Sequence, residues 1–235
     1  MIEQKAPIVE IFSSLQGEGQ HIGWPSVFLR FWGCNLRCRF DGVECDTPYA
    51  VHTEYDKAVH KTPMEVMKEI LLLAPTNIVF TGGEPLLYQD FIIELMMLLK
   101  NKDSNYTAEV ETNGTIALKG KKIINAINLF TVSQKLKSSN QPNTNEKTRI
   151  NHQALQTFPH NKSYFKFVIT KKEDLEELSE FRRKHPKMKI YLMPEGRTRE
   201  EIMNHMKEIA ELCIKNNYRY SPREHILIWS NTRGV

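Results

Sequence analysis

The sequence predicts an α/β protein: a partial (β/α) TIM-like barrel with about six parallel strands in a single domain. Between about residues 26 and 193, apolar runs typical of strands alternate with runs typical of helices, and this alternation favours parallel βα units. Eight such units need about 250 residues, whereas this chain has 235 and spends many of them on long loops. No internal repeat, low-complexity segment or linker divides it, so residues 1–235 are expected to form one domain.

The strands are predicted from short runs rich in Ile, Val and Phe. Helices are expected between most of them, which is why the strands from 26–32 to 189–193 are predicted to lie parallel. The predicted strands are residues 7–12, 26–32, 77–80, 107–111, 127–132, 164–169, 189–193 and 225–229.

Two helices are predicted from capping boxes. Thr62 precedes Pro63 at the first helical position and Glu65 three residues after the cap, so a helix should run to about residue 73. Thr198 and Glu201 form a second capping box that opens a helix to about residue 216. Further helices are predicted over residues 89–100, 151–157 and 173–184, and the polar stretch 137–148 is predicted to be a mobile loop.

Composition excludes several classes of protein. The formal charge of +4, from 32 basic and 28 acidic residues, is too mild to favour nucleic-acid binding and fits an ordinary solvated surface. No apolar run approaches the roughly 18 residues needed to span a bilayer, and the N-terminus shows no secretory signal. A cytoplasmic location is therefore expected, in which thiols stay reduced. Four cysteines, three of them clustered, then favour metal binding over disulfides.

Three cysteines lie in one short loop, at Cys34, Cys38 and Cys45. Three thiolates can hold three irons of a [4Fe–4S] cluster and leave the fourth iron open to a small molecule. The loop follows the predicted strand 26–32, at the sheet edge where parallel α/β proteins carry their active sites. A zinc site with His52 as a fourth ligand, or unrelated buried thiols, are the alternatives.

A second motif, Thr-Gly-Gly-Glu-Pro at residues 81–85, follows the predicted strand 77–80. Two glycines directly after a strand let the backbone approach a ligand closely. Backbone carbonyls and Glu84 would attract a cationic group such as an ammonium. An ordinary strand-to-helix turn is the alternative, since Gly and Pro are common there.

Together, the cysteine loop and the Gly-Gly-Glu-Pro motif resemble the radical S-adenosylmethionine (SAM) enzymes. The resemblance implies that the amine and carboxylate of SAM chelate the open iron, beside Gly82, Gly83 and Glu84. It also implies that cleavage of SAM yields a 5′-deoxyadenosyl radical that takes hydrogen from a substrate. The cofactors then carry the difficult chemistry, and the protein positions them and excludes water.

Further motifs narrow the resemblance. Leu-Gln-Gly-Glu-Gly stands at residues 15–19, Glu-Thr-Asn-Gly-Thr at 111–115, Thr-Val-Ser-Gln-Lys at 131–135 and Arg-Gly-Val at 233–235. From about residue 8 to residue 235 the chain resembles the 7-carboxy-7-deazaguanine synthases. The resemblance implies a carbon–nitrogen lyase that converts 6-carboxy-5,6,7,8-tetrahydropterin to 7-carboxy-7-deazaguanine with loss of ammonia, for 7-deazapurine (queuosine-type) biosynthesis. SAM is regenerated and Mg²⁺ assists.

The resemblance also implies site residues, with no side chain given an acid–base role. The cluster would be held by Cys34, Cys38 and Cys45, and Mg²⁺ by Thr47. SAM would be bound by Glu44, Cys45, Asp46, Gly83, Glu84, Ser133, Gln134, Lys135, Met193, Pro194 and Glu195. The substrate would be bound by an N-terminal strand and loop and by a C-terminal extension, through Leu15, Gln16, Gly17, Arg30, Thr81, His225 and Val235.

Chemistry supports several of these assignments. The amide of Gln16 offers a donor and an acceptor to a pterin edge, and the guanidinium of Arg30, in an otherwise apolar strand, matches a carboxylate. A hydroxyl such as that of Thr47 suits Mg²⁺. Structural alternatives are a turn cap for Thr47, core packing for Met193 and a satisfied core histidine for His225. The fourth cysteine, Cys213, is predicted to be a buried small apolar residue.

The chain departs from the family pattern at two places. Six residues separate Cys38 from Cys45, where the family usually has two, and Asp41–Gly42 is expected to form a small excursion that returns Cys45 to the cluster. Gln134 stands where proline is usual, which loosens the turn that holds Ser133 and Lys135. Neither change removes a metal ligand.

Two other functions fit the motifs less fully. Another small radical SAM enzyme, such as a glycyl-radical activase, would need a surface for a large protein partner. A non-catalytic iron–sulfur or zinc module would hold a saturated metal and would leave Gly-Gly-Glu-Pro without a role. The resemblance implies an electron donor such as flavodoxin or ferredoxin and a homodimer, with no direct contact to nucleic acid or membrane. It leaves modified tRNA and modified DNA both open as the product's destination.

Overall fold

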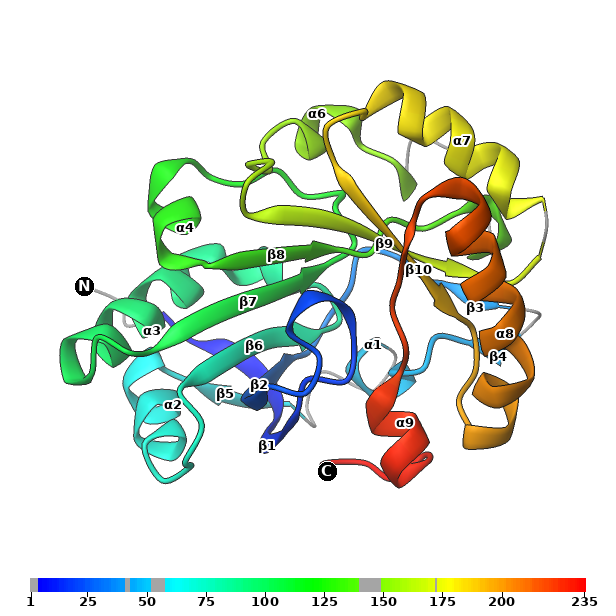
Figure 1. The fold of residues 1–235 in the computed structure, drawn as a ribbon. Coiled ribbons are helices and arrows are strands. Elements are labelled where there is room, and N and C mark those ends of the chain that lie inside the picture. Colours follow the sequence, from blue (N-terminus) through cyan, green and yellow to red (C-terminus); the bar gives the residue numbers. More distant parts are fainter. Residues whose placement is uncertain (1–3, 41–42, 52–57, 140–148, 172) are drawn as a thin grey trace.

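The computed structural model describes residues 4–40, 43–51, 58–139, 149–171 and 173–235. Within them, one curved sheet of nine strands forms the centre of the molecule (Figure 1). From one edge to the other its strands are β11 (Arg219–Tyr220), β10 (Lys189–Pro194), β9 (Ser163–Ile169), β8 (Leu129–Val132), β7 (Thr107–Thr112), β6 (Asn77–Gly82), β2 (Pro25–Phe31), β1 (Ala6–Leu15) and β5 (Val59–Lys61).

The pairing confirms the predicted fold class. Strands β2, β6, β7, β8, β9 and β10 lie side by side in parallel, and the two-residue β11 continues them. At the other edge β1 pairs antiparallel with β2, and β5 pairs antiparallel with β1. Six full parallel strands therefore make an open, barrel-like sheet, as about six βα units should.

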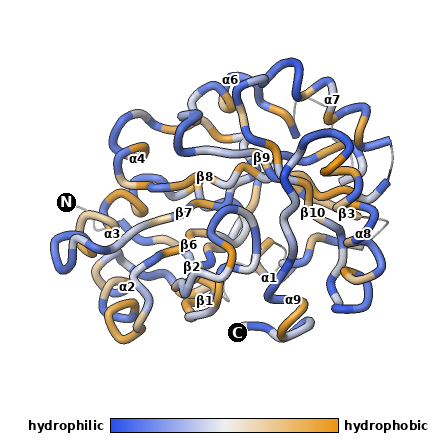
Figure 2. Tube along the Cα trace, in the orientation of Figure 1, coloured by the Kyte–Doolittle hydropathy of each residue, from blue (hydrophilic) through white to orange (hydrophobic). Residues whose placement is uncertain are grey.

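Helices follow most of the parallel strands and cover the outer face of the sheet (Figure 1). Both predicted capping boxes are present, at Thr62–Glu65 and at Thr198–Glu201. Hydrophilic and hydrophobic residues alternate along the helices in Figure 2, as in helices with one face on a sheet. The helices are α1 (Pro48–Val51), α2 (Pro63–Ile70), α3 (Gln89–Lys102), α4 (Lys121–Ala126), α6 (His152–Leu155), α7 (Asp174–Lys184), α8 (Arg199–Asn216) and α9 (Glu224–Trp229), with 3₁₀ turns at Gly19–His21, Pro85–Tyr88 and Lys137–Ser139.

The core lies between the sheet and these helices. Ala108 and Val110 of β7 belong to the main apolar cluster, together with residues such as Phe80 and Phe91. The alternate residues of β7, Glu109 and Glu111, lie on the opposite face, because successive strand side chains point to opposite sides. This period of two gives the sheet an apolar outer face and a polar concave face.

One predicted element is wrong in type. Residues 225–229 were expected to be a strand, but they lie in α9. The run is short and apolar, and such a run does not by itself distinguish a strand from a helix. The short β11 takes the edge position beside β10, and α9 buries Ile226 after the chain has left the sheet.

Several short elements were not predicted. They include α1, α4, β5 and a separate hairpin of β3 (Arg39–Phe40) and β4 (Val43–Glu44). The expected excursion at Asp41–Gly42 and the alternative zinc ligand His52 lie outside the described residues, as does most of the predicted loop 137–148. In the described part of the chain, no helix is long and apolar enough to cross a membrane.

Candidate active site

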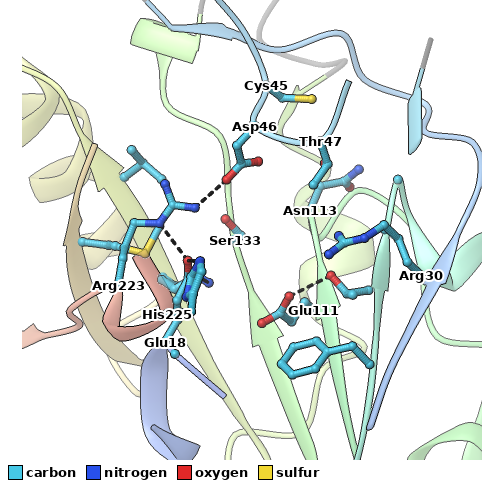
Figure 3. A pocket seen from close by; sticks show the side chains of 18 of the residues that line it. Glu18, Arg30, Cys45, Asp46, Thr47, Glu111, Asn113, Ser133, Arg223 and His225 are labelled. Atoms are coloured by element: carbon cyan, nitrogen blue, oxygen red, sulfur yellow. Dashed lines mark hydrogen bonds and ion pairs between the residues drawn. The ribbon is translucent and has the colours of Figure 1, made fainter. Parts of the chain in front are cut away.

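A pocket of about 270 Å³ opens at the carboxyl ends of the parallel strands, on the concave side of the sheet. Figure 3 shows its charged side chains converging from several segments of the chain. Most of the predicted site residues line it: Leu15, Gln16, Gly17, Arg30, Cys34, Cys38, Cys45, Asp46, Thr47, Thr81, Gly83, Ser133, Lys135, Met193, Glu195, His225 and Val235.

Four predicted SAM ligands, Glu44, Glu84, Gln134 and Pro194, are not among the residues that line the pocket. The carboxylate of Glu84 is fully buried and accepts backbone N–H donors from Leu86 (2.9 Å) and Asn113 (2.7 Å). Burial raises its pKa to about 6 despite these hydrogen bonds. The side chain of Glu84 therefore helps to order the loop after β7, and its contact with a cationic ligand stays a prediction.

Gln134 and Glu44 also turn to protein partners. The Gln134 amide donates to the backbone carbonyl oxygen of Arg149 over 2.5 Å and is almost fully buried. Glu44 forms an ion pair with Arg39 (3.6 Å) across the β3–β4 hairpin. These contacts give each side chain a protein partner, and SAM binding by the two residues stays a prediction.

The cysteine loop is tied at both ends by backbone hydrogen bonds. The N–H of Gly33 donates to the carbonyl of Ala50 (2.8 Å), and that of Cys45 donates to the carbonyl of Cys38 (3.1 Å). All three cysteines are free thiols on the wall of one pocket. Within the described residues, no three His, Cys, Asp or Glu side chains are arranged to ligate a single metal ion.

The surroundings of Cys34 fit an iron–sulfur ligand. Its sulfur accepts the backbone N–H of Leu36 (3.4 Å) and the amide Nδ2–H of Asn113 (3.8 Å). Hydrogen bonds to the sulfurs are a usual feature of cluster sites. Burial raises the pKa of the Cys34 thiol to about 11, so coordination to a metal is what would hold it as a thiolate.

The Gly-Gly turn after β6 packs directly on the cysteine loop. A Cβ atom on Gly83 would lie 1.9 Å from the carbonyl oxygen of Gly33. The N–H of Glu84 donates to that same oxygen over 2.7 Å. Gly82 adopts φ +117°, a region that favours glycine. The glycines thus bring the two motifs into backbone contact, beyond any approach to a ligand.

Opposite Arg30, a buried cluster of charges forms another wall of the pocket (Figure 3). Glu18 accepts hydrogen bonds from the Lys166 ammonium and from Arg223 Nε (2.9 Å). Arg223 also donates to Asp46 (2.5 Å) and to the carbonyl of Gly196 (2.5 Å). Burial alone would raise the pKa of Glu18, but the two cations hold it well below its usual value.

His225 reaches this cluster from α9. Its Nε2 lies 4.0 Å from Glu18 Oε1. Burial lowers the pKa of His225, although Glu18 opposes the shift, so the imidazole is neutral at neutral pH. A Cβ atom on Gly17 would lie 2.1 Å from His225 Nδ1, which means that a glycine at 17 is what allows the imidazole its position.

Glu111 presents a carboxylate on the remaining wall. It accepts Thr81 Oγ1–H (2.8 Å) and Gln16 Nε2–H (3.2 Å). Burial raises its pKa, while Lys166 opposes the shift. The side chains of Gln16 and Thr81 therefore orient Glu111, and the three residues together offer a row of donors and acceptors.

The prediction missed the residues that hold these walls together. Glu18, Lys166 and Arg223 were not among the candidates, nor were Glu111 and Asn113, whose motif contains Asn-Gly, also a common turn pair. Lys166 carried a local signal, since it is a charge inside the apolar strand β9. Glu18 lies within the quoted Leu-Gln-Gly-Glu-Gly motif. Nothing local marks Arg223, whose partners are distant in sequence.

Comparisons with known proteins agree with this geometry. The family model described as the radical SAM superfamily matches residues 31–209. The 7-carboxy-7-deazaguanine synthase of Pyrobaculum aerophilum is 32% identical over 231 residues, covering 97% of this chain and 96% of that protein. The synthase of Clostridium acetobutylicum is 35% identical over 235 residues, covering 97% and 98%.

A solved structure shares the fold. The crystal structure of QueE from Escherichia coli superposes with a TM-score of 0.70 at 24% identity, covering 94% of this chain and 95% of that one. Family model and near-full-length relatives point the same way: the chain belongs to the radical SAM superfamily and, within it, to the 7-carboxy-7-deazaguanine synthase family.

Proposed function

We propose that the protein is a carbon–nitrogen lyase that converts 6-carboxy-5,6,7,8-tetrahydropterin to 7-carboxy-7-deazaguanine, with loss of ammonia, in 7-deazapurine biosynthesis. The relatives carry the name of this activity. One observation supports it most: a single pocket holds the three cysteines together with the guanidinium of Arg30 and the carboxylate of Glu111. These two groups complement the carboxylate and the amino-bearing edge of the substrate.

Membership of the radical SAM superfamily implies a [4Fe–4S] cluster and SAM. We propose that Cys34, Cys38 and Cys45 hold the cluster. When bound, the two cofactors supply the radical that removes a hydrogen atom from the substrate. For SAM, we propose contacts from the pocket-lining members of the predicted set, which are Cys45, Asp46, Gly83, Ser133, Lys135, Met193 and Glu195.

The substrate fits between Arg30 and the opposite walls. Arg30 would bind the carboxylate through its planar fork of donors. Glu111 would accept hydrogen bonds from the amino group and ring N–H of the pterin, with Gln16 and Thr81 holding it in place. Leu15, Gly17, His225 and Val235 would enclose the ring, since all four line the pocket.

We also propose that Thr47 binds Mg²⁺. Thr47 lines the pocket two residues after Cys45. Its hydroxyl is a hard oxygen donor of the kind that Mg²⁺ accepts together with a substrate carboxylate. The neighbouring carboxylate of Asp46 is engaged with Arg223 (2.5 Å), so Thr47 is the better candidate in this loop.

We propose that both ends of the chain contribute to the substrate site. Residues 15–17 after β1 would supply the N-terminal substrate contacts, and residues 224–235 would act as the C-terminal extension that closes the pocket. We further propose a homodimer, a cytoplasmic location and an electron donor such as flavodoxin or ferredoxin, on the resemblance alone.

A glycyl-radical activase is the main alternative function. Such an enzyme would have to admit a segment of a large protein partner. The buried charges of Glu18, Lys166 and Arg223 in the pocket wall favour a small polar substrate instead. Non-catalytic iron–sulfur binding would leave Arg30 and Glu111 on the pocket wall without a role.

The test is an anaerobic assay. The cluster is reconstituted and reduced, and SAM, Mg²⁺ and 6-carboxy-5,6,7,8-tetrahydropterin are added for product analysis by mass spectrometry. Formation of 7-carboxy-7-deazaguanine with little net consumption of SAM is expected. Cleavage of SAM to 5′-deoxyadenosine with untouched pterin would refute the substrate and keep the radical chemistry. If neither product forms although the cluster is intact, the result would favour a non-catalytic iron–sulfur protein.

A further inference from the structure

Two arginines share one carboxylate and one aromatic ring at the edge of the pocket. Glu10 Oε1 accepts Arg30 Nε–H over 2.5 Å, and Glu10 Oε2 accepts Arg233 Nε–H over 2.8 Å. The guanidinium carbon of Arg233 lies 3.7 Å from the centroid of the Tyr49 ring, and that of Arg30 lies 5.7 Å from it. The Tyr49 hydroxyl donates to Glu10 Oε1 (3.4 Å).

These side chains come from three separate parts of the fold. Glu10 lies on β1, directly opposite Arg30 of β2 in the antiparallel register. Tyr49 lies on α1, four residues after the last cysteine of the loop. Arg233 follows α9 and stands two residues before Val235, which lines the pocket. The group therefore joins the substrate side, the cysteine loop and the segment that covers the pocket.

We propose that Glu10, Tyr49 and Arg233 form a latch that keeps Arg30 available to the carboxylate of the substrate and holds residues 231–235 over the pocket. This inference rests on the proposed function where it assigns the substrate carboxylate to Arg30. The three are positioning residues, since Glu10, Tyr49 and Arg233 lie outside the pocket lining.

The two oxygens of Glu10 are divided between Arg30 and Arg233. A carboxylate with one arginine neighbour tends to pair with it bidentately, through two parallel N–H donors. Here Arg233 occupies Oε2, so Arg30 uses Oε1 alone through Nε. Figure 3 shows the rest of the Arg30 guanidinium reaching into the pocket. Without Arg233, both oxygens of Glu10 would compete with the substrate for the fork of Arg30.

The charges of this group also favour binding of an incoming carboxylate. Arg30, Arg233 and Glu10 together carry a net charge of +1, and Glu111 on the pocket wall also interacts with Arg30. The side chains of Arg30 and Glu10 are 13% and 15% exposed, so their charges are only weakly screened, whereas Arg233, at 52% exposed, is more strongly screened by solvent. Tyr49 contributes a ring face that favours both cations and keeps their spacing.

The test compares binding of two pterin probes to the cluster-loaded protein with SAM, by anaerobic calorimetry. One probe is 6-carboxypterin, and the other is pterin without the carboxylate. Arg233→Gln should weaken 6-carboxypterin about tenfold, and should weaken pterin, which loses only the cover of residues 231–235, by no more than about threefold. The double variant Glu10→Gln/Arg233→Gln removes the competing carboxylate, so it should recover affinity to within about threefold of the unaltered protein.

Two comparisons separate the latch from general damage. Tyr49→Leu should weaken 6-carboxypterin, and Tyr49→Phe, which keeps the ring, should bind it more tightly than Tyr49→Leu does. Arg182→Gln removes another arginine placed over a tyrosine, at 5.6 Å from the Tyr218 ring and away from the pocket lining. That variant should bind both probes like the unaltered protein.

A second measurement does not depend on the substrate. Hydrogen exchange of the peptide covering residues 231–235 should become at least about fivefold faster in Arg233→Gln and stay unchanged in Arg182→Gln. Equal weakening of both probes, or unchanged exchange, would overturn the latch. Failure of the unaltered protein to bind either probe would overturn the proposed function, while the exchange result would still decide whether the latch exists.

Discussion

Arg223 donates through Nε to Glu18, a residue 205 positions earlier in the chain, over 2.9 Å. Its other two nitrogens reach Asp46 and the carbonyl of Gly196. Figure 3 shows this side chain between Glu18 of the loop after β1 and Asp46 at the end of the cysteine loop. Its bond to Gly196 adds the turn after β10. The guanidinium therefore helps to fix the relative position of segments that are distant in sequence, together with bonds such as that from Glu224 N–H to the carbonyl of Gly17 (2.8 Å).

Replacement of Arg223 by Gln should therefore affect both stability and binding. Glu18 would keep Lys166 but lose one of its two cations, and loss of one partner of a buried pair costs about 3 kcal/mol. Urea unfolding should show this loss, and the Kd values of SAM and of the pterin should both rise. Arg219→Gln is a matched control on β11, since Arg219 contacts Tyr191 and does not line the pocket. Equal effects of the two substitutions would contradict the linking role.

Glu18→Gln should change the dependence of stability on pH. Lys166 and Arg223 hold the pKa of Glu18 below its ordinary value of 4.5, despite burial. The carboxylate therefore contributes stability that is fully present above about pH 4.5 and is lost as the pH falls through the lowered pKa. At pH 7 the free energy of unfolding of the variant should be about 3 kcal/mol lower.

The gap between Glu18→Gln and the unaltered protein should start to narrow below pH 4.5. Urea unfolding between pH 7 and pH 3.5 measures it. Glu180→Gln removes a carboxylate from an exposed helix pair with Lys184 (3.0 Å), and it should leave the pH profile nearly unchanged. A gap that stays constant with pH would show that Glu18 does not titrate in the predicted way.

The fold was predictable to a large extent because its elements have strong local patterns. The apolar strands β6, β8 and β9 alternate with amphipathic helices, and both capping boxes formed where Thr62 and Thr198 predicted them. Helix α9 was mistaken for a strand because a short apolar run fits either structure. In the folded chain β11 pairs with β10 at the sheet edge, and the run in α9 follows it outside the sheet.

The candidate site was predictable where a motif directly follows a strand. Cys34 after β2, Thr81 at the end of β6 and Ser133 after β8 were brought together by the parallel sheet itself. The partners of Glu18 were not predictable in this way, because Lys166 and Arg223 lie 148 and 205 positions away. The hydrogen bond from the backbone N–H of Asn113 to the Glu84 carboxylate was not predictable either, because it forms only in the folded chain.

Gly17→Ala should weaken binding of the pterin. An added Cβ would lie 2.1 Å from His225 Nδ1 and 2.8 Å from the backbone nitrogen of the same residue, so α9 or the substrate loop must shift. A rise in the pterin Kd of about tenfold, roughly 1.4 kcal/mol, is expected. Gly120→Ala has φ +113° but open space around it, so it should lower stability by about 1 kcal/mol and leave the Kd unchanged. An unchanged Kd in Gly17→Ala would contradict the role of this close approach.

Each of Cys34→Ala, Cys38→Ala and Cys45→Ala should lose reductive cleavage of SAM and part of the bound iron while the fold persists. Three thiolates are the minimum for a site-differentiated cluster, since each holds one iron. Iron analysis and 5′-deoxyadenosine formation measure the losses, and circular dichroism reports the fold. Cys213→Ala is the control, because Cys213 lies buried in α8 away from the pocket lining. Full SAM cleavage in any of the three variants would remove that cysteine from the cluster.

Thr47→Ala tests whether the hydroxyl at this position serves the metal or only the turn before α1. A metal role predicts a rise of about tenfold in the Mg²⁺ concentration needed for half-maximal turnover, because one oxygen ligand is lost. Thr47→Ser keeps the hydroxyl and should retain most of the Mg²⁺ response. A cap role predicts instead that both variants respond to Mg²⁺ as the unaltered protein does, with only unfolding stability changed in Thr47→Ala. A backbone hydrogen bond also stabilises the turn before α1, since the N–H of Ala50 donates to the carbonyl of Thr47 over 3.0 Å. Loss of the hydroxyl therefore leaves the turn in place, and a selective effect on Mg²⁺ dependence would assign the metal to Thr47.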